Sequence, residues 1–242
     1  MKTVQVRKNV FLFLGAMSFL TVLLSGCLKQ TTTSSTPPKT FISLLHLAPR
    51  APAVEVYFDN TKASQPINPG TVSASYSAID PGIFAINFKK SGGDSLVANL
   101  GADIYDTLQH YTLLLYNYDS THVRAVRIED DFSVLANQQK AHYRFFHMSA
   151  DFGPVDLYFD NTLIESGRQY ADNTVSNYYN QFFPATPSTY NIVVKKAGSD
   201  SVIAQQYSVY MGAGSAYTLY LKGIPGKTGA TGLGVEFLQA VD

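Results

Sequence analysis

The chain has 242 residues, of which 45% are hydrophobic and 15% are charged, with 18 basic and 18 acidic side chains. This length allows one large domain or two domains of about 100 residues, and the apolar content is sufficient for a buried core, which excludes disorder for most of the chain. The balanced charge provides no basic patch and therefore argues against nucleic acid as a partner.

The first 26 residues are predicted to be a lipoprotein signal peptide. Lys2, Arg7 and Lys8 precede an uncharged, mostly apolar run at residues 10–24, which is the pattern of a targeting signal. This run is too short to cross a membrane, because a spanning helix needs about 20 residues. It ends in the sequence LSGC, whose Cys27 is the only cysteine of the chain.

The LSGC sequence resembles the lipobox of bacterial lipoproteins. The resemblance implies that the Cys27 thiol receives a diacylglycerol group and that the freed amine is acylated as well, which would anchor the mature protein in a membrane. The alternative is a cleaved secretory signal with a chance cysteine. With Cys27 acylated, no thiol is left for a disulfide. Removal of residues 1–26 would also take away three basic side chains, which leaves 15 basic and 18 acidic side chains and a formal net charge of −3.

Residues 27–40 are predicted to form a lipidated tether, because they are rich in Ser, Thr and Pro and lack an apolar period. Residue 28 is a leucine, so the aspartate that resembles an inner-membrane retention signal is absent. Residues 28–31 also lack the acidic cluster that some bacteria use for surface export. We therefore expect an outer-membrane location, with the periplasmic face and the cell-surface face both open.

Beyond the tether the sequence aligns with itself. Residues 46–61 match residues 147–162 at an offset of 101, and both segments end in YFDNT. Two later segments match at an offset of 106, which places a five-residue insertion in the second copy between Thr162 and Tyr190. The repeat predicts two domains, residues 41–137 and 141–242, joined by the polar sequence NQQK.

Each copy contains short runs that alternate between apolar and other residues, such as residues 54–58 and 217–221. A period of two is typical of half-buried strands, and we count about seven strands per copy. No helical period persists beyond the signal segment. The predicted fold is all-β, with two tandem antiparallel β-sandwich (Ig-like) domains.

Turn residues separate these runs. Asp59-Asn60 and Asp160-Asn161 tolerate positive φ and suit tight hairpin turns. The glycine-containing residues 91–94 and 197–200 indicate a second hairpin in each copy.

The repeated pattern H-x-[SA]-[PA]-x-x-x-x-V-[ED]-[VL]-Y-F-D-N resembles the bacterial domain catalogued as domain of unknown function 4397 (DUF4397), which is often found in envelope lipoproteins. The likeness covers residues 41–242, twice over. It implies β-sandwich modules in a cell envelope, and it brings no established catalytic residues.

His46 and His147 open the repeated pattern and allow two interpretations. They could ligate a metal, or act as bases, beside four carboxylates of the same segments: Glu55, Asp59, Asp156 and Asp160. A zinc site needs three or four converging ligands, and strand alternation leaves such convergence unsupported. We expect instead that each histidine ends the first strand and hydrogen-bonds the following loop, so we predict no metal site and no cofactor.

No residue pattern identifies a catalytic site. The chain lacks a Gly-x-Ser-x-Gly elbow, and no cysteine remains as a nucleophile. The sequence GKT at residues 226–228 lacks the preceding glycine of a phosphate loop, and the glycine-rich stretch 223–232 is predicted to be a mobile hairpin loop or a contact loop. The adjacent Asp130 and Asp131 are predicted to lie on a solvated turn rather than to catalyse.

The best candidate for a contact surface is the sequence SNYYNQFF at residues 176–183. Its Tyr178, Tyr179 and Phe182 could stack on sugars or fill a protein hot spot, and the alternative is that half of these rings belong to the core. We therefore expect a non-catalytic, lipid-anchored cell-envelope protein that binds or adheres to a glycan or an envelope protein. The alternatives are a structural spacer or assembly subunit and, less favoured, a polymer hydrolase.

Overall fold

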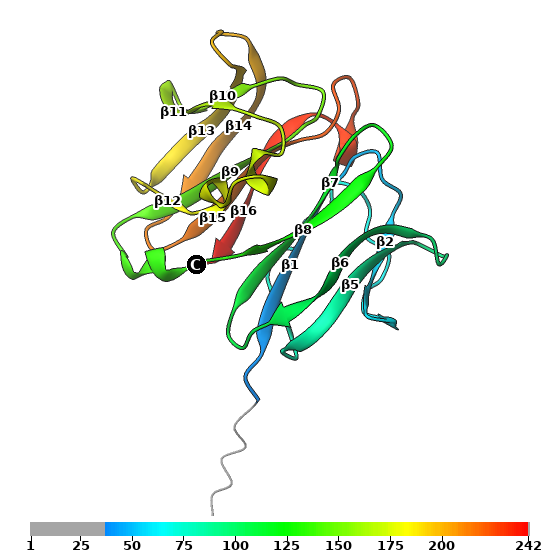
Figure 1. The fold of residues 1–242 in the computed structure, drawn as a ribbon. Helices are drawn as coiled ribbons and strands as arrows, with labels where there is room; N and C mark the ends of the chain where they lie inside the picture. Colours follow the sequence, from blue (N-terminus) through cyan, green and yellow to red (C-terminus); the bar gives the residue numbers. More distant parts are fainter. Residues whose placement is uncertain (1–36, 242) are drawn as a thin grey trace, which may run out of the picture. The chain divides into compact units, whose positions relative to one another are not determined.

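The computed structural model describes residues 37–241, so the predicted signal peptide, Cys27 and most of the tether lie outside the described residues. The described chain is all-β, as the sequence predicts, and its strands are connected by loops with four short 3₁₀ helices (Figure 1). No helix within residues 37–241 is long and apolar enough to cross a membrane.

The first copy has eight strands. Their bounds are β1 (Thr40–Leu47), β2 (Val54–Phe58), β3 (Thr61–Lys62), β4 (Ser77–Ile79), β5 (Gly82–Lys90), β6 (Leu96–Tyr105), β7 (His110–Asn117) and β8 (Val123–Glu129). They form two four-stranded sheets, with the strand orders β4-β1-β7-β8 and β3-β2-β5-β6. This is one strand more than the alternating pattern predicts, because the two-residue β3 is too short to show any alternation.

The second copy repeats this arrangement after a short 3₁₀ helix, η1 (Ser133–Ala136). Its strands are β9 (Ala141–Met148), β10 (Val155–Phe159), β11 (Thr162–Arg168), β12 (Phe183–Ala185), β13 (Ser188–Lys196), β14 (Val202–Met211), β15 (Ala216–Lys222) and β16 (Gly234–Val241). The sheets have the orders β12-β9-β15-β16 and β11-β10-β13-β14, so every sheet takes its strands from a single copy. The sandwich-like architecture predicted from the sequence is thereby confirmed.

One strand pair in each copy runs parallel, although the sequence suggested antiparallel sheets. β1 is parallel to β7, with His46 opposite Leu115, and β9 is parallel to β15, with His147 opposite Leu221. Parallel neighbours require a long crossover connection. Here the crossover runs through the other sheet, because its four strands β2, β3, β5 and β6 lie between β1 and β7 in the chain.

The predicted hairpin turns are confirmed. Asp59 and Asp160 have φ of 52° and 53°, in the left-handed region that aspartate tolerates. Phe58 pairs with Thr61 across the first turn, and Phe159 pairs with Thr162 across the second. In both copies YFDNT therefore encodes the end of one strand, the turn, and the start of the next strand.

Three hydrophobic cores hold these strands together. One core lies within each copy, and a third joins the two copies. The third core contains Leu45, Leu47, Leu114, Tyr116 and Ile128 of the first copy and Phe146, Met148, Ala171 and Tyr220 of the second. The two copies accordingly belong to one compact unit.

The third core explains why β1 and β9 are buried on both faces. Leu44 points into the core of the first copy, whereas its neighbour Leu45 points into the core between the copies. In the same way Phe145 packs in the core of the second copy, and Phe146 packs in the core between the copies. Such strands read as nearly continuous apolar runs, as FISLLHL and HYRFFHM do.

The glycine-rich loop between β15 and β16, which contains η4 (Gly229–Thr231), contacts the first copy. A Cβ atom at Gly70 would lie 2.2 Å from the backbone oxygen of Ala230, and Gly70 has a φ of +86°. The two backbones can approach this closely only because residue 70 has no side chain. Residues 223–232 thus lie in the predicted hairpin loop before the last strand, and this loop packs against the first copy.

The insertion of the second copy lies between β10 and β13. β11 has seven residues where β3 has two, and two 3₁₀ helices follow it, η2 (Asp172–Thr174) and η3 (Asn177–Asn180). No 3₁₀ helix occupies the corresponding segment of the first copy between β3 and β4. The insertion is therefore the largest structural difference between the copies.

Candidate functional site

The two repeated histidines are structural. His46 and His147 are fully buried near the ends of β1 and β9, and burial lowers the pKa of both rings. The Nε2 atoms lie 3.4 Å from the Pro52 oxygen and 3.1 Å from the Gly153 oxygen. Each ring thus holds the loop that follows its strand, as expected, and no group of three potential metal ligands occurs within residues 37–241.

The repeated carboxylates are structural as well. Asp156 accepts hydrogen bonds from the backbone N–H groups of Gly167 and Gly198, at 2.8 and 3.0 Å. Its counterpart Glu55 pairs with Lys62 at 2.9 Å and accepts a hydrogen bond from Ser91. Both acids therefore secure the same hairpin in their respective copies.

The turn aspartates Asp59 and Asp160 each accept a hydrogen bond from the neighbouring strand, from the N–H groups of Ala85 and Asn191 at 2.9 Å. The duplicated polar residues thus explain the duplicated fold, and a functional site is better sought in what the copies do not share.

One unshared feature is a buried ion pair between the copies. Asp130 follows β8 of the first copy and lies 2.5 Å from the guanidinium group of Arg144 on β9. The predicted solvated turn is therefore wrong for Asp130, whose side chain is fully buried. It holds for Asp131, which is exposed and accepts a hydrogen bond from the backbone of Ser133. The single arginine within the apolar run HYRFFHM was the available signal for a buried partner.

The N–H groups of Arg144 are already occupied. Nε donates to Thr218 at 2.9 Å, and the terminal nitrogens donate to Asp130, to Thr112 and to the backbone oxygen of Asn180. The guanidinium group also lies 4.4 Å from the centre of the Phe182 ring. A cation with this many protein partners joins the copies and is not available to bind a ligand.

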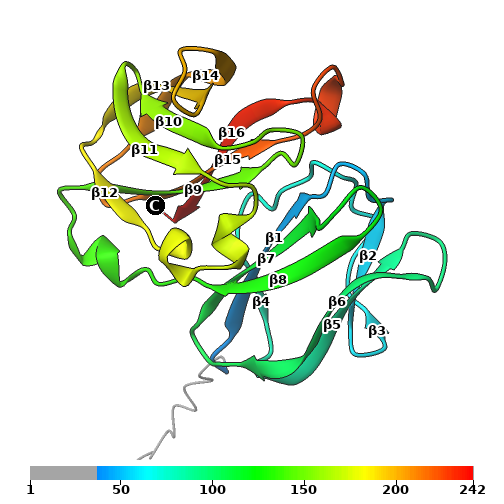
Figure 2. The same ribbon diagram turned by 45° about the horizontal axis from the view of Figure 1, so that its top comes forward.

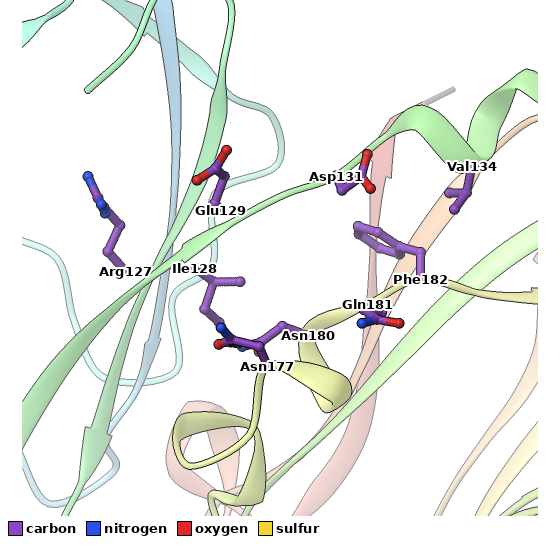
Figure 3. Close-up of a pocket in the computed structure, with 9 residues that line it drawn as sticks. All are labelled: Arg127, Ile128, Glu129, Asp131, Val134, Asn177, Asn180, Gln181 and Phe182. Atoms are coloured by element: carbon purple, nitrogen blue, oxygen red, sulfur yellow. Dashed lines mark hydrogen bonds between the residues drawn. The ribbon is translucent and has the colours of Figure 1, made fainter. Parts of the chain in front are cut away.

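A hollow of about 600 Å³ lies beside this ion pair (Figure 3). Its walls come from the end of β8, from the segment that leads into η1, and from η3 and the residues that follow it: Arg127, Ile128, Glu129, Asp131, Val134, Asn177, Asn180, Gln181 and Phe182. Phe182 is only 5% exposed and stacks on Phe132 at 5.4 Å between ring centres. Of the three predicted contact residues, Phe182 is therefore part of the packing between the copies, and its assignment to a contact surface is corrected.

A second hollow, of about 500 Å³, carries the other two predicted contact residues. It is lined by Tyr143, Ile164, Glu165, Ser166, Arg168, Tyr178, Tyr179, Phe183 and Pro184. Tyr178 is 57% exposed, and its ring lies 5.2 Å from that of Phe183 and 5.3 Å from that of Tyr179. We call this site the aromatic hollow.

The wall of the aromatic hollow contains a buried cation and a carboxylate. Arg168 is buried and donates to both carboxylate oxygens of Asp172 at 2.7 Å, to the Phe145 oxygen at 2.8 Å and to Glu165. The ring of Tyr179 covers its guanidinium group at 4.1 Å. Four of the five N–H donors of Arg168 are thus used within the protein, and the sequence signal for this cluster is the spacing of Glu165, Arg168 and Asp172 in the insertion.

Glu165 is held by two neighbouring side chains. Its Oε2 accepts from Arg168, its carboxyl group also hydrogen-bonds with Tyr143, and its Oε1 is shielded from solvent. Burial raises the pKa of Glu165 although Arg168 opposes the shift, and burial together with the Glu165 charge raises the pKa of Tyr143. The aromatic hollow therefore presents the exposed ring of Tyr178 above a buried, interacting group of Glu165, Tyr143 and Arg168.

A family match covers the first copy and the beginning of the second. The family described as domain of unknown function (DUF4397) matches residues 40–158, which include all strands of the first copy together with β9 and most of β10. A search of curated proteins found no match to the chain.

Proposed function

We propose that this chain, which matches DUF4397 over residues 40–158, is a non-catalytic, lipid-anchored protein of the cell envelope that binds a neutral glycan in the aromatic hollow. The observation that carries the proposal is the exposed ring of Tyr178, which lies beside the rings of Tyr179 and Phe183 in the wall of the hollow. Sugars present apolar faces that stack on aromatic rings.

The charges of the hollow favour a neutral sugar over an acidic one. Arg168, the cation in its wall, already donates to Asp172, Glu165 and a backbone oxygen. An anionic sugar would thus meet a carboxylate and no free cation, which is unfavourable in a partly desolvated site.

The same arrangement supports a binding role rather than hydrolysis. A glycosidase of the common types needs two carboxyl groups on either side of the scissile bond. Among the described residues that line the aromatic hollow, Glu165 is the only carboxylate, and both oxygens of nearby Asp172 accept from Arg168. One carboxylate does not provide the pair that hydrolysis requires.

The anchor is proposed from the sequence. The lipobox-like LSGC and the Ser, Thr and Pro-rich residues that follow it support acylation of Cys27 at an outer membrane, with the described residues joined to the lipid through the tether.

A glycan array with the detergent-solubilised full chain tests the binding proposal. We expect binding to neutral oligosaccharides, weakened about fivefold or more by Tyr178→Ala, because an aromatic contact contributes about 1 kcal/mol. Tyr207→Ala is the matched control, since Tyr207 is 61% exposed on β14 and does not line the hollow. Equal effects of the two substitutions, or binding to an envelope protein and to no glycan, would contradict the proposal.

A structural spacer is the second candidate, and the third core favours it. A spacer must hold its two halves rigidly, and the apolar contact around Leu45 and Phe146 together with the buried Asp130–Arg144 pair does so. This function predicts that neither wild type nor any variant binds a glycan in the same array.

A further inference from the structure

Three exposed aliphatic side chains gather at one end of the first copy. Ile83 is 71%, Ile104 54% and Leu108 66% exposed. Ile83 and Ile104 are directly opposite each other in the β5–β6 ladder and therefore share one face of the sheet. Leu108 follows in the turn to β7. We call these three residues the end patch.

The end patch lies where the chain enters the first copy. The N–H group of Leu108 donates to the backbone oxygen of Lys39 at 2.7 Å, one residue before β1 begins. Figures 1 and 2 both show the start of β1 at the same end of the first copy as the start of β5 and the end of β6. Single exposed aliphatic residues are ordinary, but three together at the end where the chain enters the first copy indicate a surface that contacts another molecule.

We propose that the end patch docks on a zwitterionic phospholipid surface. The inference rests on the proposed acylation of Cys27, because the lipid brings that surface within reach. Nine residues lie between Cys27 and Pro37, and even a fully extended chain over these ten steps spans at most about 36 Å. The end of the first copy that carries Lys39 is thus the end held nearest to the membrane, and transfer of its aliphatic groups out of water is favourable.

The charges around the end patch select the type of surface. Lys39 pairs with Asp80, and Arg127 pairs with Asp103 at 2.7 Å. Asp106, in the same turn as Leu108, is exposed and adds a negative charge. With both neighbouring cations paired, this end has no excess positive charge to attract anionic lipids.

Site-specific labelling of the full-length lipidated chain tests the inference. Ile104→Cys introduces one reactive thiol, since the sulfur of Cys27 carries the lipid, and a polarity-sensitive fluorophore is attached to it. Leu96→Cys is the matched control, because Leu96 is 57% exposed on the same strand, about 26 Å away. In phosphatidylcholine–phosphatidylethanolamine vesicles we expect iodide quenching at position 104 to fall at least threefold relative to detergent, with little change at position 96.

Two further measurements separate the outcomes. Mass spectrometry of the N-terminal peptide reports whether Cys27 is acylated, and an unmodified cysteine would overturn both the anchor and the docking. Equal quenching at positions 96 and 104 in the acylated protein would overturn the docking alone. Ile83→Ser combined with Leu108→Ser should abolish the protection at position 104 without changing the acylation.

Discussion

Asp130 of the first copy and Arg144 of the second form an ion pair whose side chains are both buried, 2.5 Å apart. The hydroxyl groups of Tyr76 and Thr112 each donate to Asp130 at 2.6 Å. Such a buried charge pair depends on both partners. Removal of one partner leaves the other as an unpaired charge in a low-dielectric environment, which destabilises the folded state.

Arg144→Ala is therefore expected to lower the free energy of unfolding by about 3–5 kcal/mol, because Asp130 would remain buried without its partner. Urea denaturation measures this change. Arg124→Ala is the matched control, since Arg124 is exposed and contacts only the Tyr118 ring among the described interactions. The double variant Asp130→Asn, Arg144→Met should recover part of the loss, and an additive loss would contradict the coupling of the two residues.

Phe146→Ala should destabilise the whole chain rather than one copy. The side chain is fully buried in the core between the copies, so the cavity is expected to cost about 3–5 kcal/mol. In calorimetry we expect one transition for both copies, shifted to lower temperature. Phe237→Ala, on the exposed side of β16, should shift it little. Two separate transitions in the parent protein would show that the copies unfold independently.

His147→Ala should cost about 1–3 kcal/mol, because it removes a fully buried ring together with the hydrogen bond that this ring donates to the Gly153 oxygen. The bound metal content should not change. His122→Ala, at an exposed residue paired with Asp119, is the control. Stoichiometric metal in the parent protein that disappears in His147→Ala would contradict the structural role.

The same histidines predict a pH dependence. Burial lowers the pKa of His46 and His147 below the ordinary value of 6.5, so near and below that pH the unfolded chain binds protons that the folded chain does not. Their contribution is fully present above pH 6.5 and is lost as the pH falls through the folded pKa values. Denaturation midpoints should thus fall on acidification, less steeply in His147→Ala.

Gly70→Ala should cost more than Gly92→Ala. Both glycines have positive φ, of 86° and 73°, so either substitution introduces backbone strain of about 1–3 kcal/mol. Only at Gly70 would the new methyl group also meet the backbone of Ala230. The difference between the two variants in thermal denaturation measures the contact between the loops, and equal losses would contradict it.

Cys27→Ser should abolish lipidation, and partitioning of the protein into a detergent phase should disappear with it. A serine variant that partitions like the parent would show that the lipobox assignment is wrong.

Sequence reasoning succeeded where the role of a residue is local. Asp59 and Asp160 sit in two-residue turns whose backbone conformation depends on the turn itself, and the histidine loops close over six residues. The second copy also provided an internal check on each of these assignments. The fold class and the hairpins could thus be predicted.

Sequence reasoning failed where a residue contacts a side chain of the other copy. Nothing local distinguishes a solvated Asp130 from one that meets Arg144, and Phe182 was indistinguishable from Tyr178 until Phe132 was seen to cover it. The parallel pair of β1 and β7 was also hidden, because a period of two specifies which face is buried and not the direction of the neighbouring strand. The pairing of Arg168 with Glu165 and Asp172 depends on how the insertion folds, which the spacing of these residues alone does not specify.

The third core is built from corresponding positions of the two copies. Leu45 and Phe146 are 101 residues apart, as are Leu47 and Met148, and Leu114 and Tyr220 differ by the later offset of 106. A contact that uses the same patch on both partners is isologous, the kind found in symmetric homodimers. Covalent linkage makes such an assembly independent of protein concentration. The two halves of one chain can also differ in sequence, unlike the subunits of a homodimer. An acid in one half can therefore face an arginine in the other, and a single half can carry the aromatic insertion.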